Sequence, residues 1–281
     1  MQTNEVWFKA TGHCKASDYD LATMYLMDAG VGALEELDSS TADRTDFCFY
    51  AESAEKREAI ISRFPEYRFF TEDEPAKDWD RWWRDRATPV HVSERLWVKP
   101  PWVKFAPENP DAILLELEAK SAFGTGDHAT TALIAGMIGD LELEGKTFLD
   151  IGTGTGILTM LADKLGARFA VGTEIDMLAL PCIAENFERN KCENAHAVFG
   201  FLDVFKENAV FDHIVCNMIR TEFWPSRKDV ERLLAPNGHF ILTGQLTAEK
   251  NYVLSWFDEC RFKPIREKTR DEWWCVEAIR M

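Results

Sequence analysis

The sequence lacks the features that mark secreted, membrane-spanning and metal-binding proteins. Its seven cysteines are odd in number and scattered, and because none forms a C-x-x-C pair they predict neither a disulfide framework nor a zinc site. No apolar run approaches the roughly 18–20 residues of a membrane span. No basic segment followed by an apolar one stands near the first residue, so no secretory signal is expected. These absences together predict a cytoplasmic protein with reduced thiols.

Basic residues are also scarce relative to acidic ones. The 281 residues include 32 Lys and Arg against 48 Asp and Glu, which gives a net charge of −16. A protein of this charge is not expected to bind nucleic acid directly through its phosphates. Residues 1–75 alone hold seven basic and 16 acidic residues, which is more than half of the net charge. This concentration indicates either a solvated surface or a face that steers a basic protein partner.

The remaining composition suits a folded protein of two domains, since 46% of the residues are apolar and the length is sufficient. In residues 1–72 the patterns predict strands at 5–10, 33–37, 46–51 and 66–71, with helices at 17–29 and 53–64. This β-α-β-β-α-β order is that of a ferredoxin-like domain. Residues 73–108 predict a connecting segment, with a short helix from residue 79 and a strand at 96–98. Residues 109–281 make up the larger predicted domain.

The larger predicted domain contains a glycine-rich turn between a predicted strand and a predicted helix. Residues 147–156 (TFLDIGTGTG) predict a strand, a glycine turn and the start of a helix, as in a doubly wound α/β sheet. Gly152, Gly154 and Gly156 let the backbone approach a ligand closely. The helix N-terminus favours a ligand carboxylate, and Asp150 can attract a positive group. The D-x-G-x-G-x-G spacing differs from the dinucleotide G-x-G-x-x-G pattern and resembles the S-adenosyl-L-methionine (AdoMet) loop of class I methyltransferases.

Polar residues also stand at the ends of the next predicted strands, where ligands bind in open α/β sheets. Glu174 ends the second strand, 22 residues after Gly152, and can accept hydrogen bonds from ribose hydroxyls. Asp203 follows the third strand at 196–201. Its carboxylate either accepts a hydrogen bond from an adenine amine or is a solvated acid in a loop. Asn217 ends the fourth strand at 211–216, where its amide oxygen can accept from an amine that enters for methylation; the alternative is a plain turn residue.

A signature upstream of the glycine turn carries a family resemblance. In residues 121–131 (SAFGTGDHATT) the matching positions are Phe123, Gly124, Thr125, Gly126, His128, Thr130 and Thr131. They resemble the F-G-T-G-x-H-x-T-T signature of ribosomal protein L11 methyltransferases, and Thr131 stands 21 residues before Gly152. The segment RLWVKPPW and the N-terminal unit are similar to the family's linker and substrate-recognition domain. The resemblance implies a Rossmann-like seven-stranded class I methyltransferase sheet with an N-terminal ferredoxin-like α+β domain.

The resemblance also implies an activity and a set of site residues. Family positions that contact AdoMet fall on Thr131, Gly152, Glu174 and Asn217, and Phe123 with residues 124–126 would cover the methionine end. Asn217 would orient the acceptor amine. The implied reaction is AdoMet-dependent methylation of lysine ε-amines and/or the N-terminal α-amine of ribosomal protein L11, a basic protein partner. Separately, we expect a monomer and no metal site. His128 suits a helix start better than a direct chemical role.

Several departures from the family pattern concern the acceptor. Residues 118–121 read EAKS where the family usually has a D-P-G-like turn, and Asp127 and Ala129 replace the usual Thr and Pro. Glu174 is one methylene longer than the usual Asp, and Arg220 adds a charge beside the expected acceptor entrance. Two alternatives therefore stay open. The first is a related class I methyltransferase acting on another protein or a small amine, and the second is a non-catalytic AdoMet-binding, ribosome-associated module. The number of methyl groups transferred is likewise open.

Overall fold

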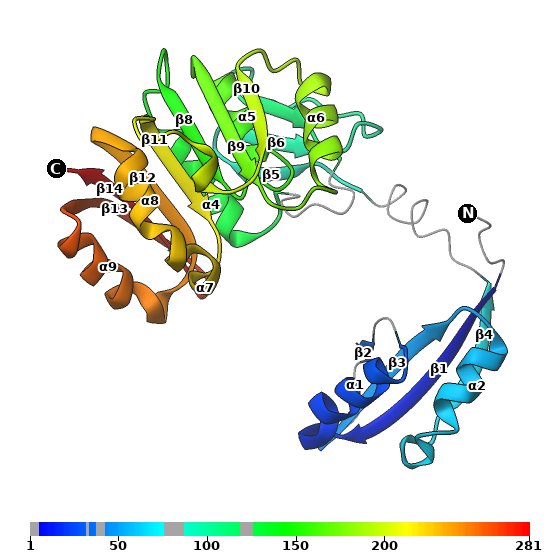
Figure 1. Ribbon diagram of the computed structural model, residues 1–281. Helices are drawn as coiled ribbons and strands as arrows, with labels where there is room; N and C mark the ends of the chain where they lie inside the picture. The colour runs from blue at the N-terminus through cyan, green and yellow to red at the C-terminus, as the bar shows by residue number, and fades with distance from the viewer. Residues whose placement is uncertain (1–5, 32–33, 38–42, 76–86, 119–125) are drawn as a thin grey trace. The chain divides into compact units, whose positions relative to one another are not determined.

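The computed structural model describes residues 6–31, 34–37, 43–75, 87–118 and 126–281. The chain forms two compact units, Met1–Arg86 and Ala87–Met281 (Figure 1). The second unit includes strands β5 (Val90–Ser93) and β6 (Leu96–Lys99), which fall within the segment 73–108 that the sequence assigned to a connection. The strand predicted at 96–98 is confirmed as β6, whereas the short helix predicted from residue 79 lies outside the described residues.

The first unit is a four-stranded antiparallel sheet with two helices packed on one face. Its strands are β1 (Val6–Lys15), β2 (Glu35–Leu37), β3 (Arg44–Ala51) and β4 (Phe70–Pro75), and its helices are α1 (Tyr19–Asp28) and α2 (Ala54–Ile61). The sheet order β2-β3-β1-β4 matches the predicted ferredoxin-like arrangement. Its core joins Ala10, Phe47 and Phe49 of the sheet to Leu26 of α1 and Ile60 of α2.

The strand predicted at 66–71 is wrong over residues 66–69. Residues Pro65–Tyr67 form a short 3-10 helix, and the φ of Arg68 directly after it is 47°, in the left-handed region. Proline fixes its own φ and has no N–H to donate to a strand ladder. Pairing with β1 therefore starts only at Phe70.

The second unit is built on a seven-stranded sheet of order β10-β9-β8-β11-β12-β14-β13. Its strands are β8 (Thr147–Ile151), β9 (Phe169–Glu174), β10 (Ala195–Phe199), β11 (Phe211–Asn217), β12 (Leu234–Leu246), β13 (Phe262–Arg270) and β14 (Trp273–Arg280). The five strands from β10 to β12 run parallel, and β14 is antiparallel to both of its neighbours, β12 and β13. This topology confirms the predicted Rossmann-like sheet.

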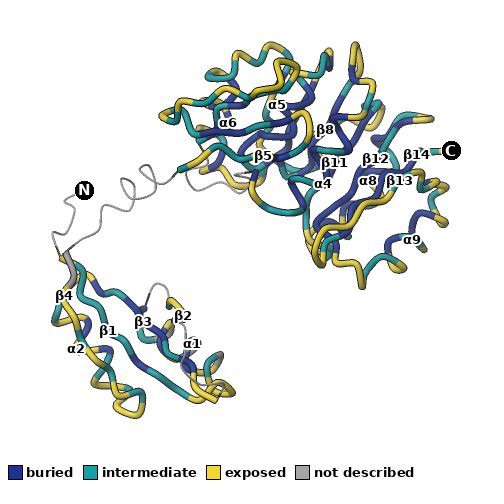
Figure 2. Tube along the Cα trace, turned by 180° about the vertical axis from the view of Figure 1, so that it is seen from behind, coloured by how far each residue is buried: buried dark blue, intermediate teal, exposed yellow. Residues whose placement is uncertain are grey.

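Helices cover both faces of this sheet, as Figure 1 shows. They are α4 (Ala129–Ile138), α5 (Ile157–Lys164), α6 (Leu180–Arg189), α7 (Arg220–Phe223), α8 (Arg227–Leu233) and α9 (Lys250–Glu259). Phe148 of β8 packs in a core with α4, α5 and α6, whereas the next residue, Leu149, packs in a core with α8 and α9. Such double burial is typical of parallel strands, and the tube of Figure 2 is accordingly coloured as buried along β8 and β11.

A small three-stranded sheet, β5-β6-β7, adds β7 (Ile113–Glu116) to the second unit. Its buried residues Val92, Leu96 and Leu115 belong to the same core as α4 and α5. The chain continues from β7 to Glu118. Residues 119–125, which include the first five residues of the signature at 121–131, lie outside the described residues.

The order of the strands also defines where a ligand binds. From β8 the chain proceeds outward to β9 and β10, and it then returns to place β11 on the other side of β8. Ligands of open α/β sheets occupy the crevice at the C-terminal ends of the strands where this reversal occurs. Here that crevice lies between the residues that follow Ile151 and those that follow Asn217.

Candidate active site

A cavity of about 960 Å³ opens at the C-terminal ends of β8, β9 and β11. Its walls come from the glycine loop after β8, the loop after β9, the turn after β11 and the start of α4. Five of the predicted site residues line it, namely Thr131, Gly152, Gly154, Glu174 and Asn217. The fold therefore brings together side chains and backbone that four separate sequence segments contribute.

The glycine loop between β8 and α5 has left-handed backbone at each of its three glycines. The φ angles are 70° at Gly152, 56° at Gly154 and 85° at Gly156. Gly152 and Gly154 line the cavity, where the missing side chain leaves the backbone open to a ligand. Gly156 does not line it. A Cβ at Gly156 would lie 2.6 Å from Cε1 of Phe187 on α6, so this glycine allows two helices to pack closely.

Gly156→Ala is expected to destabilise the protein by about 2 kcal/mol, because the added methyl combines a positive φ with a clash against Phe187. Gly145→Ala is the matched control, since φ at Gly145 is also positive (69°) but nothing lies within 4 Å of an added Cβ. The control should lose only about 1 kcal/mol. Urea unfolding followed by tryptophan fluorescence measures both losses, and equal losses would contradict the packing role of Gly156.

The Glu174 carboxylate at the end of β9 holds two loops of the cavity together. Its Oε2 accepts a hydrogen bond from the backbone N–H of Gly154 at 3.0 Å. Its Oε1 accepts from the backbone N–H groups of Ile175 at 2.9 Å and Asp176 at 3.0 Å. Because a carboxylate oxygen has two lone pairs, Oε2 retains one for a ligand hydroxyl. The position and the free lone pair suit recognition of a ribose.

Two predicted carboxylates, Asp150 and Asp203, are not among the residues that line the cavity. Asp150 is 1% exposed, and its Oδ2 accepts from the hydroxyls of Thr153 at 2.6 Å and Thr159 at 3.0 Å. Burial raises the pKa of Asp150 to about 6. Asp150 thus braces the glycine loop from within the protein. Asp203 is exposed in a short 3-10 helix (Leu202–Val204) after β10, and its contact with adenine stays a prediction.

Two threonine hydroxyls at the cavity are buried. Thr131 is 1% and Thr173 0% exposed, and among the described residues neither Oγ1 has a hydrogen-bond partner. Both residues line the cavity. Since buried polar groups are nearly always hydrogen-bonded, a polar ligand fits here. The combination of free hydroxyls, a carboxylate and open glycine backbone matches the amino-acid and ribose parts of AdoMet.

The described part of the chain contains no cluster of metal-ligand side chains. In the described ranges, no group of three or more His, Cys, Asp and Glu side chains is placed to hold a metal ion. The same ranges hold no helix with the length and apolar character to cross a membrane.

Comparison with known proteins identifies the family of the chain. The family model described as "Ribosomal protein L11 methyltransferase (PrmA)" matches residues 41–281. The chain belongs to the ribosomal protein L11 methyltransferase family. The matched range includes the whole second unit and the part of the first unit from residue 41 onward.

Relatives within the L11 methyltransferase family align with about two thirds to three quarters of this chain's length. The "Ribosomal protein L11 methyltransferase" of Vibrio campbellii is 37% identical over 200 residues, which cover 71% of this chain and 66% of that protein. The protein of the same description from Aliivibrio salmonicida is 37% identical over 205 residues, which cover 73% of this chain and 68% of that protein. The match thus spans just under two thirds of the first relative's length.

A solved structure in this family has the same fold. The "ribosomal protein L11 methylase" from Lactobacillus delbrueckii subsp. bulgaricus aligns with a TM-score of 0.63 and 24% identity, covering 68% of this chain and 98% of that one. At this level of identity the likeness bears on the fold alone.

The L11 methyltransferase signature ends at the start of α4. Phe123, Gly124 and Thr125 lie outside the described residues. His128 is the N-cap of α4, with its Nδ1 accepting from the backbone N–H of Thr130 at 3.3 Å and lying 2.8 Å from the Thr130 hydroxyl. The helix-start interpretation of His128 is confirmed, and the residue also lines the cavity.

One buried asparagine that the sequence analysis missed connects this signature to the glycine loop. Asn186 of α6 is 0% exposed. Its Oδ1 accepts from the backbone N–H of Glu118 at 3.1 Å, and its Nδ2 donates to the carbonyls of Glu118 at 3.3 Å and Thr155 at 3.1 Å. Asn186 thus fixes the chain just before residues 119–125 relative to the glycine loop. A polar residue within the apolar stripe of a helix was the available signal.

A second missed residue fixes the turn after Asn217. Gln245 of β12 is 0% exposed and donates from Nε2 to the carbonyl of Met218 at 2.6 Å. The preceding Gly244 has a φ of 83°, and a Cβ there would lie 2.4 Å from the same carbonyl oxygen. Only a glycine therefore lets β12 approach this turn so closely. Together Gly244 and Gln245 place the backbone beside Asn217 at the cavity.

Proposed function

We propose that this protein is an AdoMet-dependent protein N-methyltransferase that acts on ribosomal protein L11 in the cytoplasm. The proposed acceptors are lysine ε-amines and/or the N-terminal α-amine. The observation that carries the proposal is the cavity at the strand reversal, where Glu174, Asn217 and the unpartnered hydroxyls of Thr131 and Thr173 meet. Membership in the family, whose description names L11, supports the choice of acceptor.

The cavity offers a group for each end of the cofactor. Glu174 has a lone pair for the ribose hydroxyls, and Gly152 and Gly154 admit the ligand to the backbone. The N-terminus of α5 and the hydroxyl of Thr131 suit the carboxylate end. Residues 123–125 are a further proposed contact with the methionine part. When bound, AdoMet supplies an electrophilic methyl group on its sulfonium.

The acceptor amine has to lose its proton before it attacks the methyl group. A lysine ammonium has a reference pKa of about 10.4, so it is charged near neutral pH. The apolar side chains of Met218, Ile219 and Trp273 line the cavity and disfavour the charged form. The proton leaves to water. Asn217 then accepts a hydrogen bond from the neutral amine and aligns its lone pair for in-line attack, with Gln245 holding the turn.

The face of the first unit's sheet that lies opposite its two helices fits a basic protein. Strand register places Trp7, Tyr50 and Phe70 on the face opposite the helices, together with the exposed carboxylates of Glu35 and Glu72. Trp7 and Tyr50 contact edge to face at 6.2 Å, and Phe70 is 65% exposed. Aromatic rings and carboxylates both attract lysine and arginine side chains. We therefore propose this unit as the substrate-recognition domain.

The direct test is methyl transfer from labelled AdoMet to purified L11. Label is expected on L11, and peptide mass spectrometry is expected to place it on lysine side chains or the N-terminal amine. Protein heated beyond its unfolding transition serves as the control for non-enzymatic transfer.

The same assay on a cell extract separates the alternatives. If L11 stays unlabelled while another protein or a small amine gains label, the related class I methyltransferase is the correct assignment. If the protein binds AdoMet in a calorimeter but labels nothing in the extract, it is a non-catalytic binding module.

A further inference from the structure

We propose that helix α7 selects a cationic acceptor: Glu222 supplies a negative charge at the cavity, and Glu249 holds the positive charge of Arg220 away from it. The inference rests on the proposed function and concerns the same cavity. It identifies which residues of the cavity interact electrostatically with the charge of the incoming side chain.

Of the three carboxylates that line the cavity, Glu174, Asp176 and Glu222, only Glu222 accepts no side-chain hydrogen bond from the described residues. It lies in α7, is exposed and lines the cavity beside Asn217. The Glu174 carboxylate already accepts three backbone N–H groups, and Asp176 accepts from the N–H of Leu178 at 2.9 Å. For the side chain of Glu222, in contrast, the described residues supply neither a hydrogen bond nor an ion pair. Its negative charge is therefore available to a cation at the entrance.

Arg220, the charge that the sequence placed at this entrance, is not among the residues that line the cavity. Its Nε donates to Oε1 of Glu249 at 2.6 Å, and its guanidinium carbon lies 5.2 Å from the ring centroid of Tyr252. Glu249 is itself fixed, because its other carboxylate oxygen accepts from the N–H of Leu246 at 3.0 Å. Among the described lining residues there is no lysine or arginine.

This arrangement matters because the two reacting partners carry like charges. The sulfonium of AdoMet is positive, and a lysine side chain approaches it as an ammonium, so the encounter is repulsive. A carboxylate at the entrance offsets that repulsion. The same carboxylate raises the pKa of a nearby amine and so opposes its deprotonation. Glu222 is therefore suited to the approach of the acceptor and not to the transfer, and its removal should change KM more than kcat.

The test uses steady-state methylation of purified L11 at saturating AdoMet. Glu222→Gln should raise the KM for L11 by roughly threefold to fivefold, the range of an exposed ion pair, with kcat within a factor of two. Glu222→Lys should raise KM further, and added salt should shrink both effects. Calorimetry should give the wild-type dissociation constant for AdoMet in both variants.

A second pair of variants tests the role of Arg220. Glu249→Gln removes the negative charge that balances the Arg220 guanidinium and should raise KM in the same direction as Glu222→Gln. Arg220→Gln should leave KM near the wild-type value, and the double variant Arg220→Gln with Glu249→Gln should return KM to that value because no unbalanced cation remains. If the double variant is as impaired as Glu249→Gln, the effect is structural and the inference is overturned.

The outcome also separates the inference from the proposed function. Wild-type protein that transfers no methyl group to L11 would overturn the proposed function and the inference with it. Wild-type transfer with an unchanged KM in Glu222→Gln and Glu222→Lys would overturn the inference alone.

Discussion

Glu174→Ala is expected to weaken AdoMet binding by roughly 30-fold to 150-fold, which corresponds to about 2–3 kcal/mol. The substitution removes the charged acceptor proposed for the ribose hydroxyls. It also leaves the backbone N–H groups of Gly154 and Asp176 without their partner, so the glycine loop and the loop after β9 lose their link. Titration calorimetry with AdoMet measures the change directly.

The conservative variant Glu174→Gln separates the contribution of charge from that of shape. Its amide keeps one oxygen that can accept, so its dissociation constant should lie between those of wild type and Glu174→Ala. The thermal midpoint without AdoMet reports damage to the fold itself. A Glu174→Ala protein with both a wild-type midpoint and a wild-type dissociation constant would refute the ribose assignment.

Local patterns made much of the second unit predictable. Thr147–Ile151 reads as a buried strand, and the glycines after it require positive φ, so both the turn and its place at a strand end follow from a few neighbouring residues. Glu174 and Asn217 could be placed at strand ends by the same reasoning. The parallel order of the sheet then brings these ends to one edge, where the cavity lies.

Long-range packing made the rest unpredictable. Asn186 contacts Glu118, which lies 68 residues away, and no local pattern indicates that pairing. The sequence put the positive charge of Arg220 at the acceptor entrance, but the bond to Glu249, 29 residues further on, removes it from the cavity. For Asp150, the position before the glycines suggested a ligand contact, whereas the buried carboxylate accepts from the hydroxyls of Thr153 and Thr159 and does not line the cavity.

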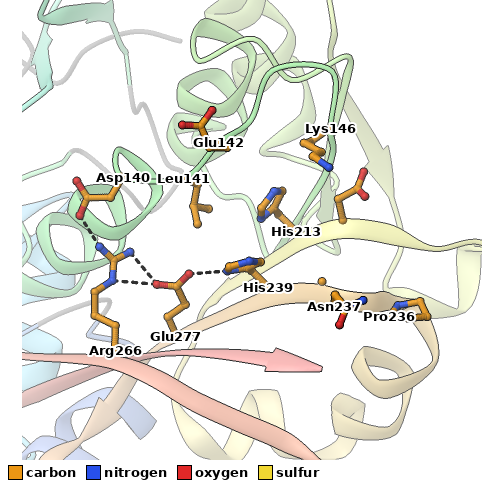
Figure 3. A pocket seen from close by; sticks show the side chains of 12 residues that line it. Asp140, Leu141, Glu142, Lys146, His213, Pro236, Asn237, His239, Arg266 and Glu277 are labelled. Atoms are coloured by element: carbon orange, nitrogen blue, oxygen red, sulfur yellow. Dashed lines mark hydrogen bonds and ion pairs between the residues drawn. The ribbon is translucent and has the colours of Figure 1, made fainter. Parts of the chain in front are cut away.

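A second cavity, of about 430 Å³, lies at the opposite edge of the seven-stranded sheet, where β8 and β11 begin (Figure 3). The rings of His213 and His239 lie there with their centroids 5.3 Å apart. Nδ1 of His239 is 2.7 Å from Oε1 of Glu277, whose Oε2 accepts from Nε of Arg266 at 2.9 Å. Arg266 also forms an ion pair with Asp140. The cavity thus surrounds two histidines with a charged network.

Of the two histidines, His213 is the one whose protonation the cavity opposes. It is 5% exposed, and burial, reinforced by His239, lowers the pKa of His213 to about 4. Of the other groups that face it, Lys146 also disfavours the imidazolium, whereas Asp212 and the carbonyl of Glu142 favour it. The unfolded chain, in contrast, binds this proton near pH 6.5.

The folded protein is therefore expected to lose stability as the pH falls from 6.5 toward 4. Over this range His213 binds a proton in the unfolded state but stays neutral in most folded molecules, so unfolding becomes more favourable. The loss should be about 2 kcal/mol at pH 5 and about 3 kcal/mol at pH 4, and the full stability is present above pH 6.5. Asp150 acts in the opposite sense, because its pKa is raised to about 6 and its stabilising effect is lost as the pH rises through 6.

The two effects are separated by comparing wild type with His213→Gln in urea unfolding between pH 8 and pH 4. Glutamine does not titrate and keeps an N–H donor for the Glu142 carbonyl, whereas Asp150 is present in both proteins and cancels in the difference. The difference in unfolding free energy should be constant above pH 7 and then shift in favour of the variant by about 2 kcal/mol at pH 5. A difference that stays constant down to pH 4 would show that His213 takes up its proton equally in the folded and unfolded states, and that the cavity at this edge of the sheet admits the charge.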